Sequence, residues 1–281
     1  MRFRGATVVA GIALVVGLGA AACGGGTQPP PLSARGQQLT QILSGIAPKS
    51  VDDQFELDMA GRQQQLDSSC MAAHHFNYVA RDPHSLVDTV TETDFTSLDY
   101  AKTYGFGVTT FPHLTGVDPN AATLAAMSSA QQDAYTKQLV ACDDAANQQT
   151  NKEYDVDDAN QVFNEIDQDV QNDPRYRDAV AAWHQCASAV GYQDPDRTSL
   201  ISRLRDRMGV IRDDLSTTAA KSGAPSDATV ASLAEHDTGF QQLHQEEVTA
   251  AVATFPCSQR LDATYRDVYR SHETSTGQPK H

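Results

Sequence analysis

The sequence predicts a mostly all-α protein, in which two disulfide-stapled helical pseudo-repeats pack together, with one irregular or short β segment near residues 77–117. Three observations predict this fold. Apolar residues recur every three or four positions along most of the chain, as on the buried face of an amphipathic helix. Four of the cysteines divide into two pairs that have nearly the same spacing. Only residues 77–117 break the helical pattern, because they combine Pro and Gly with β-branched residues.

The beginning of the chain is typical of an export signal. Arg2 and Arg4 precede an apolar stretch from Ala6 to Ala22, which ends in small residues directly before Cys23. This basic, apolar and small-residue layout predicts a signal peptide over residues 1–22. It resembles a bacterial lipoprotein signal, in which the cysteine at the first mature position receives lipid chains such as palmitate.

Lipidation of Cys23 implies an address on the extracytoplasmic face of the bacterial cell membrane, with the membrane as a partner through the lipid anchor. Residues 23–35 are rich in Gly and Pro and are expected to form a flexible tether. Two alternatives stay open: a secreted protein without lipid, and a retained signal anchor. The apolar stretch is close to the short limit of a membrane span, about 17 residues.

The chain is acidic, with a formal net charge of −15 at pH 7. A negative surface repels nucleic acid and anionic polymers, so we expect no nucleic-acid partner. It favours cations or basic partners, or it simply keeps the helix faces solvated.

Helical signals of the first half begin with a short apolar stripe before Pro48. A longer stripe runs from Phe55 to Ala73. Asp118-Pro119 is typical of a capped helix start with Pro at the first helical position. A helix from about 127 to 149 is expected to follow.

Helical signals of the second half start at the acidic run beginning with Asp155, which precedes an apolar stripe. Asp173-Pro174 repeats the capped helix start, and that helix is expected to close at Gly191. A clean amphipathic stripe spans 200–215. A last helical region is predicted from about Ser226 to Ser271, with a kink at Pro256.

A duplication relates the two halves. Cys70 and Cys186 are each followed, six residues later, by an aromatic residue. We predict a helix that carries cysteine near its end, then a residue with positive φ, then an aromatic that turns back onto the core. Gly191 suits the positive-φ position, and His75 occupies the same position in the first half. The predicted repeats are residues 36–152 and 153–273, and residues 274–281 form a disordered tail.

The cysteine count predicts two disulfides. If Cys23 carries lipid, four cysteines remain, an even number in an oxidising compartment. The duplication favours Cys70–Cys142 with Cys186–Cys257, because each bridge then staples one repeat. The alternative, Cys70–Cys186 with Cys142–Cys257, stays open.

Several elements together resemble a group of uncharacterised actinobacterial secreted or lipid-anchored proteins. The resemblance spans residues 66–270 and supports architecture and address, because the group has no function to carry over. Two departures are His75 at a position that is usually Gly and Phe255-Pro256 in place of an Asp-rich lead into the last cysteine. The elements are Cys70-Met71 with Phe76 and Tyr78, Tyr104-Gly105-Phe106-Gly107, Asp173-Pro174 with Trp183 and Cys186, Gly191-Tyr192, and the helix before Cys257.

Histidines form two candidate sites, and neither predicts a metal or a cofactor. His74 and His75 are adjacent, so on a helix they point about 100° apart, and His84 follows in a loop. His236 and His244, near Glu246-Glu247, lie about 12 Å apart along a helix. The H-E-x-x-H zinc spacing is absent.

The acidic run from Asp155 also resembles the start of a calcium loop. Ala159 and Ile166 stand where that loop needs an oxygen ligand and a bidentate Glu, so we interpret the run as a helix start.

The chain contains no G-x-S-x-G, S-x-x-K or Gly-rich phosphate-loop motif. We therefore predict a non-enzymatic binding or accessory module of the envelope, whose partner is an unknown envelope protein or ligand. The alternatives are an envelope glycan hydrolase and a substrate-capturing component of a transporter. A hydrolase is expected to show a deep cleft with converging carboxylates of perturbed pKa. A binding module is expected to show an exposed apolar patch.

Overall fold

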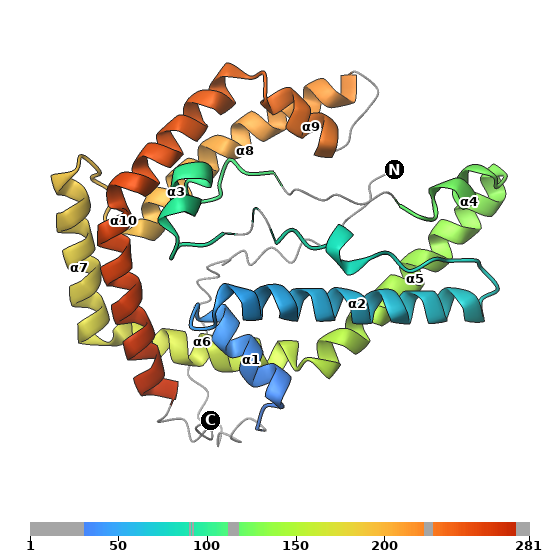
Figure 1. The fold of residues 1–281 in the computed structure, drawn as a ribbon, viewed down its shortest axis with the longest axis horizontal. Coiled ribbons are helices and arrows are strands. Elements are labelled where there is room, and N and C mark those ends of the chain that lie inside the picture. Colours follow the sequence, from blue (N-terminus) through green and yellow to red (C-terminus); the bar gives the residue numbers. More distant parts are fainter. Residues whose placement is uncertain (1–30, 90, 92, 112–117, 222–226, 274–281) are drawn as a thin grey trace, which may run out of the picture. The chain divides into compact units, whose positions relative to one another are not determined.

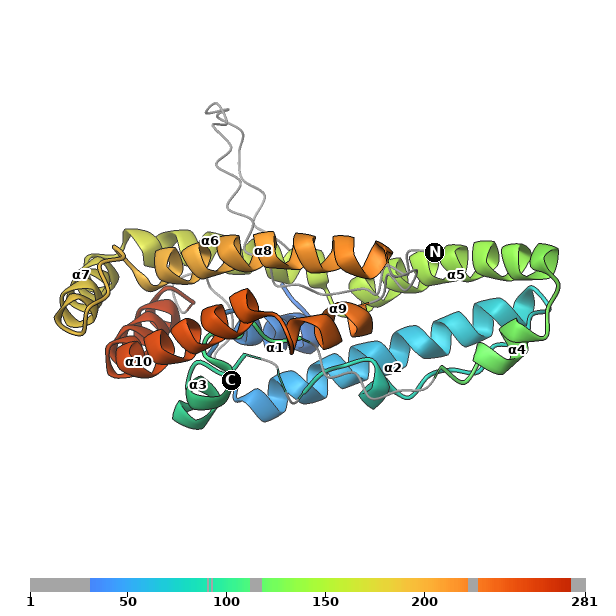
Figure 2. The same cartoon turned by 90° about the horizontal axis from the view of Figure 1, so that it is seen from above.

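The computed structural model describes residues 31–89, 91, 93–111, 118–221 and 227–273, which all belong to one compact unit. Within these ranges the protein is helical and has no β-strand (Figures 1 and 2). The mostly all-α prediction is confirmed. No helix of the described ranges has both the length and the apolar content that a membrane crossing needs.

Three predictions fall on the ends of the chain. The signal peptide, the lipidation site Cys23 and the tail at 274–281 lie outside the described residues. The end of the predicted tether lies inside them, where Leu32 is buried and Ser33 caps the first helix by accepting a hydrogen bond from the Gly36 N–H.

The described helices pack through four apolar clusters, and most of their bounds follow the predicted stripes. In chain order the elements are α1 (Ala34–Leu43), α2 (Lys49–Ala73), the 3₁₀ turn η1 (Pro83–Ser85), α3 (Leu98–Tyr104), α4 (Ala121–Ala125), α5 (Ser129–Glu153), α6 (Val156–Asn172), α7 (Pro174–Ala189), α8 (Arg197–Lys221), α9 (Asp227–Ala234) and α10 (Thr238–Glu273).

Helices α2 and α5 form the first of two disulfide-linked helix pairs (Figure 2). The disulfide Cys70–Cys142 joins them across 72 residues of sequence, with Cα atoms 5.6 Å apart. Farther along the pair, Arg62 donates two hydrogen bonds of 2.7 Å to the Glu153 carboxylate. Since Arg62 precedes Cys70 while Glu153 follows Cys142, the two helices run antiparallel.

Helices α7 and α10 form the second disulfide-linked helix pair (Figure 1). The disulfide Cys186–Cys257 joins them across 71 residues, with Cα atoms 5.8 Å apart. One turn before this bridge, the buried Trp183 ring donates from Nε1 to the Ser258 hydroxyl over 3.2 Å. The predicted pairing of the cysteines is thus confirmed, with one bridge in each half.

The two disulfide-linked helix pairs are also alike in the backbone at the ends of α2 and α7. His75 has a φ of 63° and Gly191 a φ of 98°, so both residues adopt the predicted left-handed conformation. The residue after each one bonds back into the helix, Phe76 N–H to Met71 C=O at 2.9 Å and Tyr192 N–H to Ala187 C=O at 3.0 Å. Each acceptor directly follows the first cysteine of its repeat, so the same C-terminal motif ends α2 and α7.

The β alternative for residues 77–117 is not seen in the described part of that segment. Asp88 accepts a hydrogen bond of 3.0 Å from the Thr91 N–H, which makes a local turn where a strand pair was possible. Farther on, Ser97 caps α3 by accepting from the Tyr100 N–H, and α3 buries Tyr100 and Ala101. The described part of the segment is therefore irregular apart from η1 and the short α-helix α3, which the sequence analysis missed.

Two helix boundaries differ from the prediction. Asp118-Pro119 lies one turn ahead of α4, because the buried Asn120 is held outside the helix by hydrogen bonds from and to the Val79 backbone. The predicted helical region at 226–271 divides, since the Asp237 carboxylate accepts from the Phe240 N–H and so starts α10 anew. Pro256 lies inside α10, which continues past it.

Candidate functional site

The carboxylate of Glu247, on α10, is fully buried, and its two oxygens accept four hydrogen bonds. Oε1 accepts hydrogen bonds from the backbone N–H groups of Phe106 (2.8 Å) and Val108 (2.6 Å). Oε2 accepts from both the N–H (2.9 Å) and the hydroxyl of Thr109. We call Glu247 the anchor carboxylate, because it fixes the segment after α3 against α10.

The local sequence explains how the backbone comes so close to the anchor carboxylate. Gly105 ends α3 with a φ of 65°, and a Cβ at this position would lie 2.5 Å from the Cγ of Glu247. Gly107 has a φ of 78°, and a Cβ there would lie 2.7 Å from the Thr93 hydroxyl. The Tyr-Gly-Phe-Gly sequence thus supplies glycine at both positions where a side chain does not fit.

A second polar contact ties His244 to the same segment. The Thr109 oxygen lies 2.8 Å from Nδ1 of His244, one turn before Glu247 on α10. With the Thr109 hydroxyl donating to the anchor carboxylate, its oxygen accepts from an Nδ1–H of His244. In this tautomer, with the hydrogen on Nδ1, Nε2 carries a lone pair that accepts hydrogen bonds.

A series of ring contacts leads from His244 through Phe240 to Phe111. The His244 ring is stacked on Phe240, with ring centroids 6.4 Å apart, and Phe240 packs on Phe111 at 5.6 Å. The Arg212 guanidinium of α8 lies over the Phe111 ring, 5.3 Å from its centroid. These contacts hold Phe111 between α8 and α10.

An open cleft of about 560 Å³ lies against these groups. Its described lining combines hydroxyl groups with aromatic rings and includes no Asp, Glu, Lys or Arg. The lining residues are Thr91, Thr103, Tyr104, Thr109, Thr110, Phe111 and His244.

The two carboxylates whose pKa rises most do not converge on this cleft. Burial, reinforced by Asp52, raises the pKa of Glu56 to about 7. Burial and the nearby Asp143 raise the pKa of Asp67 to about 7. Both residues lie on α2, about 16 Å apart along its axis at 1.5 Å per residue. They therefore cannot form a carboxylate pair around one substrate bond.

Asp67 belongs instead to a buried polar cluster beside the first disulfide. Gln64 donates 3.2 Å to Oδ2 of Asp67 and accepts from the Tyr78 hydroxyl and the Arg81 N–H. Oδ1 of Asp67 and the Tyr135 hydroxyl are buried and form no hydrogen bond within the described part of the chain.

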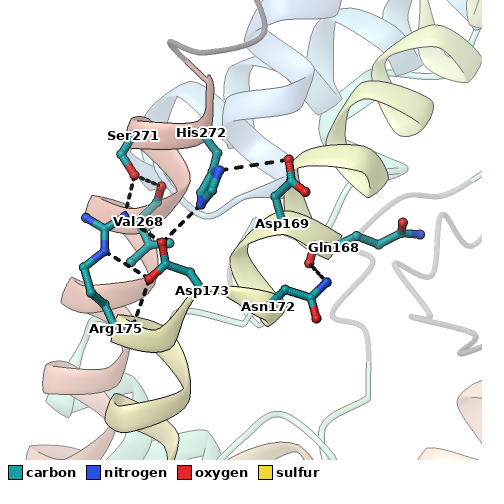
Figure 3. A network of polar contacts seen from close by, with 8 residues as sticks. All are labelled: Gln168, Asp169, Asn172, Asp173, Arg175, Val268, Ser271 and His272. Carbon is teal, nitrogen blue, oxygen red and sulfur yellow. Dashed lines mark hydrogen bonds and ion pairs between the residues drawn. The ribbon is translucent and has the colours of Figure 1, made fainter. Parts of the chain in front are cut away.

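A third polar network joins the α6–α7 junction to the end of α10 (Figure 3). Asp173 caps α7 and accepts two hydrogen bonds from the Arg175 guanidinium, which also donates to Ser271. His272 lies with Nε2 3.2 Å from the Asp173 carboxylate and Nδ1 4.0 Å from that of Asp169. The Arg175 hydrogen bonds hold the pKa of Asp173 well below its usual range. This network stabilises a helix junction rather than lining a cleft.

The other histidines of the sequence analysis lie apart. His74 and His75 end α2 and are exposed, His84 lies in η1, and His236 lies in the turn before α10 instead of on it. Among the described residues, no group of three or more His, Cys, Asp or Glu side chains is arranged to hold a metal ion.

The acidic run is a helix start, as interpreted. Asp155, with a φ of 51°, directly precedes α6, and its carboxylate accepts a 2.8 Å hydrogen bond from the Ser33 N–H. Its charge is therefore used to join α1 to α6.

The exposed apolar patch expected of a binding module is not found among the described residues. Their exposed large apolar side chains lie singly on different elements. They are Val79, Leu98, Val140, Val190 and Val210.

Sequence reasoning identified His244 and Glu247 as neighbours but missed their partner Thr109. The available signal was their spacing of three on one helix face, together with the Gly-Phe-Gly turn. Comparison of the chain with protein-family models, with curated proteins and with solved structures gives no match.

Proposed function

We propose that the chain is a lipoprotein of a bacterial envelope, held on the extracytoplasmic face of the cell membrane by lipid on Cys23. The observation that carries this proposal is the division of the cysteines. Four of them form two disulfides, and Cys23 is the remaining one, directly after the apolar stretch. Disulfides persist in oxidising compartments outside the cytoplasm, so the stapled fold supports export.

Within the envelope, the protein acts as a non-enzymatic binding module through the cleft beside the anchor carboxylate. Glycan hydrolysis generally uses two carboxyl groups that flank the bond to be broken. The anchor carboxylate does not suit that role, because three backbone N–H groups and one hydroxyl occupy its oxygens. Its position supports a shaping role, in which it holds Thr109 at the cleft wall.

An envelope glycan hydrolase is the second candidate. The chain of contacts from Glu247 through Thr109 to His244 favours it, because it orients an imidazole at a cleft. Incubation with envelope polysaccharide separates the candidates: a hydrolase releases new reducing ends, and a binding module releases none.

The address is tested by mass spectrometry of the protein purified from the membrane fraction, beside the variant Cys23→Ser. We expect a diacylglyceryl adduct on an N-terminal Cys23, and loss of both adduct and membrane retention in C23S. An unmodified N-terminus downstream of residue 23 would overturn the proposal.

A further inference from the structure

We propose that the cleft between the segment after α3 and helix α10 binds a neutral, hydroxyl-rich carbohydrate. This inference rests on the proposed binding function and names its ligand class. The cleft volume of about 560 Å³ lies within the range of small-molecule sites, about 300–1,000 Å³.

The hydroxyl groups of the lining carry the first step. Four threonines and one tyrosine line the cleft. The hydroxyls of Thr91, Thr103 and Thr109 already donate to Asp88, to the Asp99 carbonyl and to Glu247, so toward a ligand they are hydrogen-bond acceptors. A sugar presents the same type of group around its ring edge. A lining of this kind therefore accepts hydrogen bonds from sugar hydroxyls without a charged side chain.

The aromatic rings carry the second step. Tyr104 and Phe111 are both cleft residues, and Phe111 is held by its contacts with Phe240 and Arg212. The C–H faces of a sugar ring are apolar, and they pack on aromatic faces while the hydroxyls bond at the edge. Hydroxyl and aromatic groups in one cleft thus match both surfaces of a sugar.

One polar atom gives the cleft hydrogen-bonding capacity beyond the protein's own contacts. Oγ1 of Thr110 bonds to no other described residue, but it is buried and out of reach of a ligand. Nε2 of His244 is an acceptor in the tautomer that Thr109 selects. A ligand hydroxyl that donates to His244 satisfies this atom.

Charge narrows the class to neutral carbohydrates. The described lining offers no Lys or Arg to pair with a phosphate or carboxylate, and the chain carries a net charge of −15. Anionic glycans are therefore repelled at long range and find no compensating partner in the cleft.

The test uses the full-length lipidated protein in detergent and isothermal titration calorimetry. The probes are oligosaccharides of three to six sugars released from the bacterium's own envelope, separated into a neutral and an acidic fraction. The monosaccharides of the neutral fraction form a third arm, which distinguishes a free sugar from a glycan chain.

Thr103→Val keeps the shape of the side chain and removes an exposed lining hydroxyl. We expect it to weaken binding of the neutral fraction about 3- to 10-fold, as one hydrogen bond does. Tyr104→Phe removes a second lining hydroxyl and serves if T103V does not fold. Thr218→Val, on an exposed face of α8 outside the cleft lining, is the matched control and leaves binding unchanged.

Binding of the acidic fraction alone, or equal affinity in native, T103V and Y104F proteins, overturns the inference. Absence of carbohydrate binding while Cys23 carries lipid overturns the ligand class and leaves the proposed address intact. An unlipidated, unretained protein whose cleft still binds sugar overturns the address alone.

Discussion

Replacement of Asp67 by Asn is predicted to stabilise the protein at neutral and alkaline pH. Asp67 is 1 % exposed, and one of its carboxylate oxygens is buried without a hydrogen bond to the described residues. Burial, followed by repulsion from Asp143, raises its pKa to about 7. Ionised Asp67 is therefore a buried charge with incomplete compensation.

The magnitude follows from the pKa difference. An Asp in the unfolded chain titrates near 4 and the folded one at about 7. Because the folded pKa is the higher one, stability is full below pH 4, falls as the pH rises from about 4 to 7, and stays low above. Three pH units correspond to about 4 kcal/mol, and we expect Asp67→Asn to recover about 2–4 kcal/mol of this at pH 8.

The assay is urea unfolding followed by far-ultraviolet circular dichroism at pH 4, 6 and 8, with the disulfides intact. The matched control is Asp58→Asn, an exposed carboxylate on the same helix. D67N is expected to equal the native protein at pH 4 and to exceed it at pH 8, while D58N follows the native curve. Equal stability of native and D67N proteins at all three pH values refutes the reasoning.

Three further predictions concern the anchor, the staples and the helix junction. Gly105→Ala lowers the free energy of unfolding by about 1–3 kcal/mol, because its Cβ overlaps the anchor carboxylate and its φ is positive; Gly209→Ala, with open space around it, leaves stability unchanged or slightly raised. Replacing Cys70 and Cys142 together by Ser lowers the free energy of unfolding by about 2–5 kcal/mol in urea unfolding, and an unchanged unfolding midpoint contradicts a stabilising Cys70–Cys142 disulfide. Asp173→Ala removes a carboxyl whose pKa is depressed, so the variant's loss of stability is full above about pH 4 and shrinks only as the pH falls below 4 toward the depressed pKa of Asp173, as thermal midpoints at pH 2, 4 and 7 show.

Features set by short stretches of sequence were predictable. The left-handed residues His75 and Gly191 follow from a helix that must stop before an aromatic turns back. The disulfide pairing follows from the duplication, because each repeat closes its own bridge. The start of α7 at Asp173-Pro174 follows from capping chemistry within three residues.

Features set by contacts between distant segments were not predictable. Thr109 and Glu247 lie 138 positions apart, and no local pattern indicates that the carboxylate accepts backbone hydrogen bonds from that loop. The boundary at Asn120 depends in the same way on the backbone of Val79, 41 positions earlier. The β-branched residues of 77–117 favoured a strand, but the described part of that segment makes local turns and α3 instead.

Hydrogen–deuterium exchange of the full-length protein, with and without an extract of the bacterium's envelope, tests most directly whether the cleft is the functional site. Binding there slows exchange in peptides covering residues 103–111 and 240–247 and leaves exchange in helices α2 and α5 unchanged. Slowed exchange confined to α2–α5, or no change at the cleft while another surface becomes protected, contradicts the account.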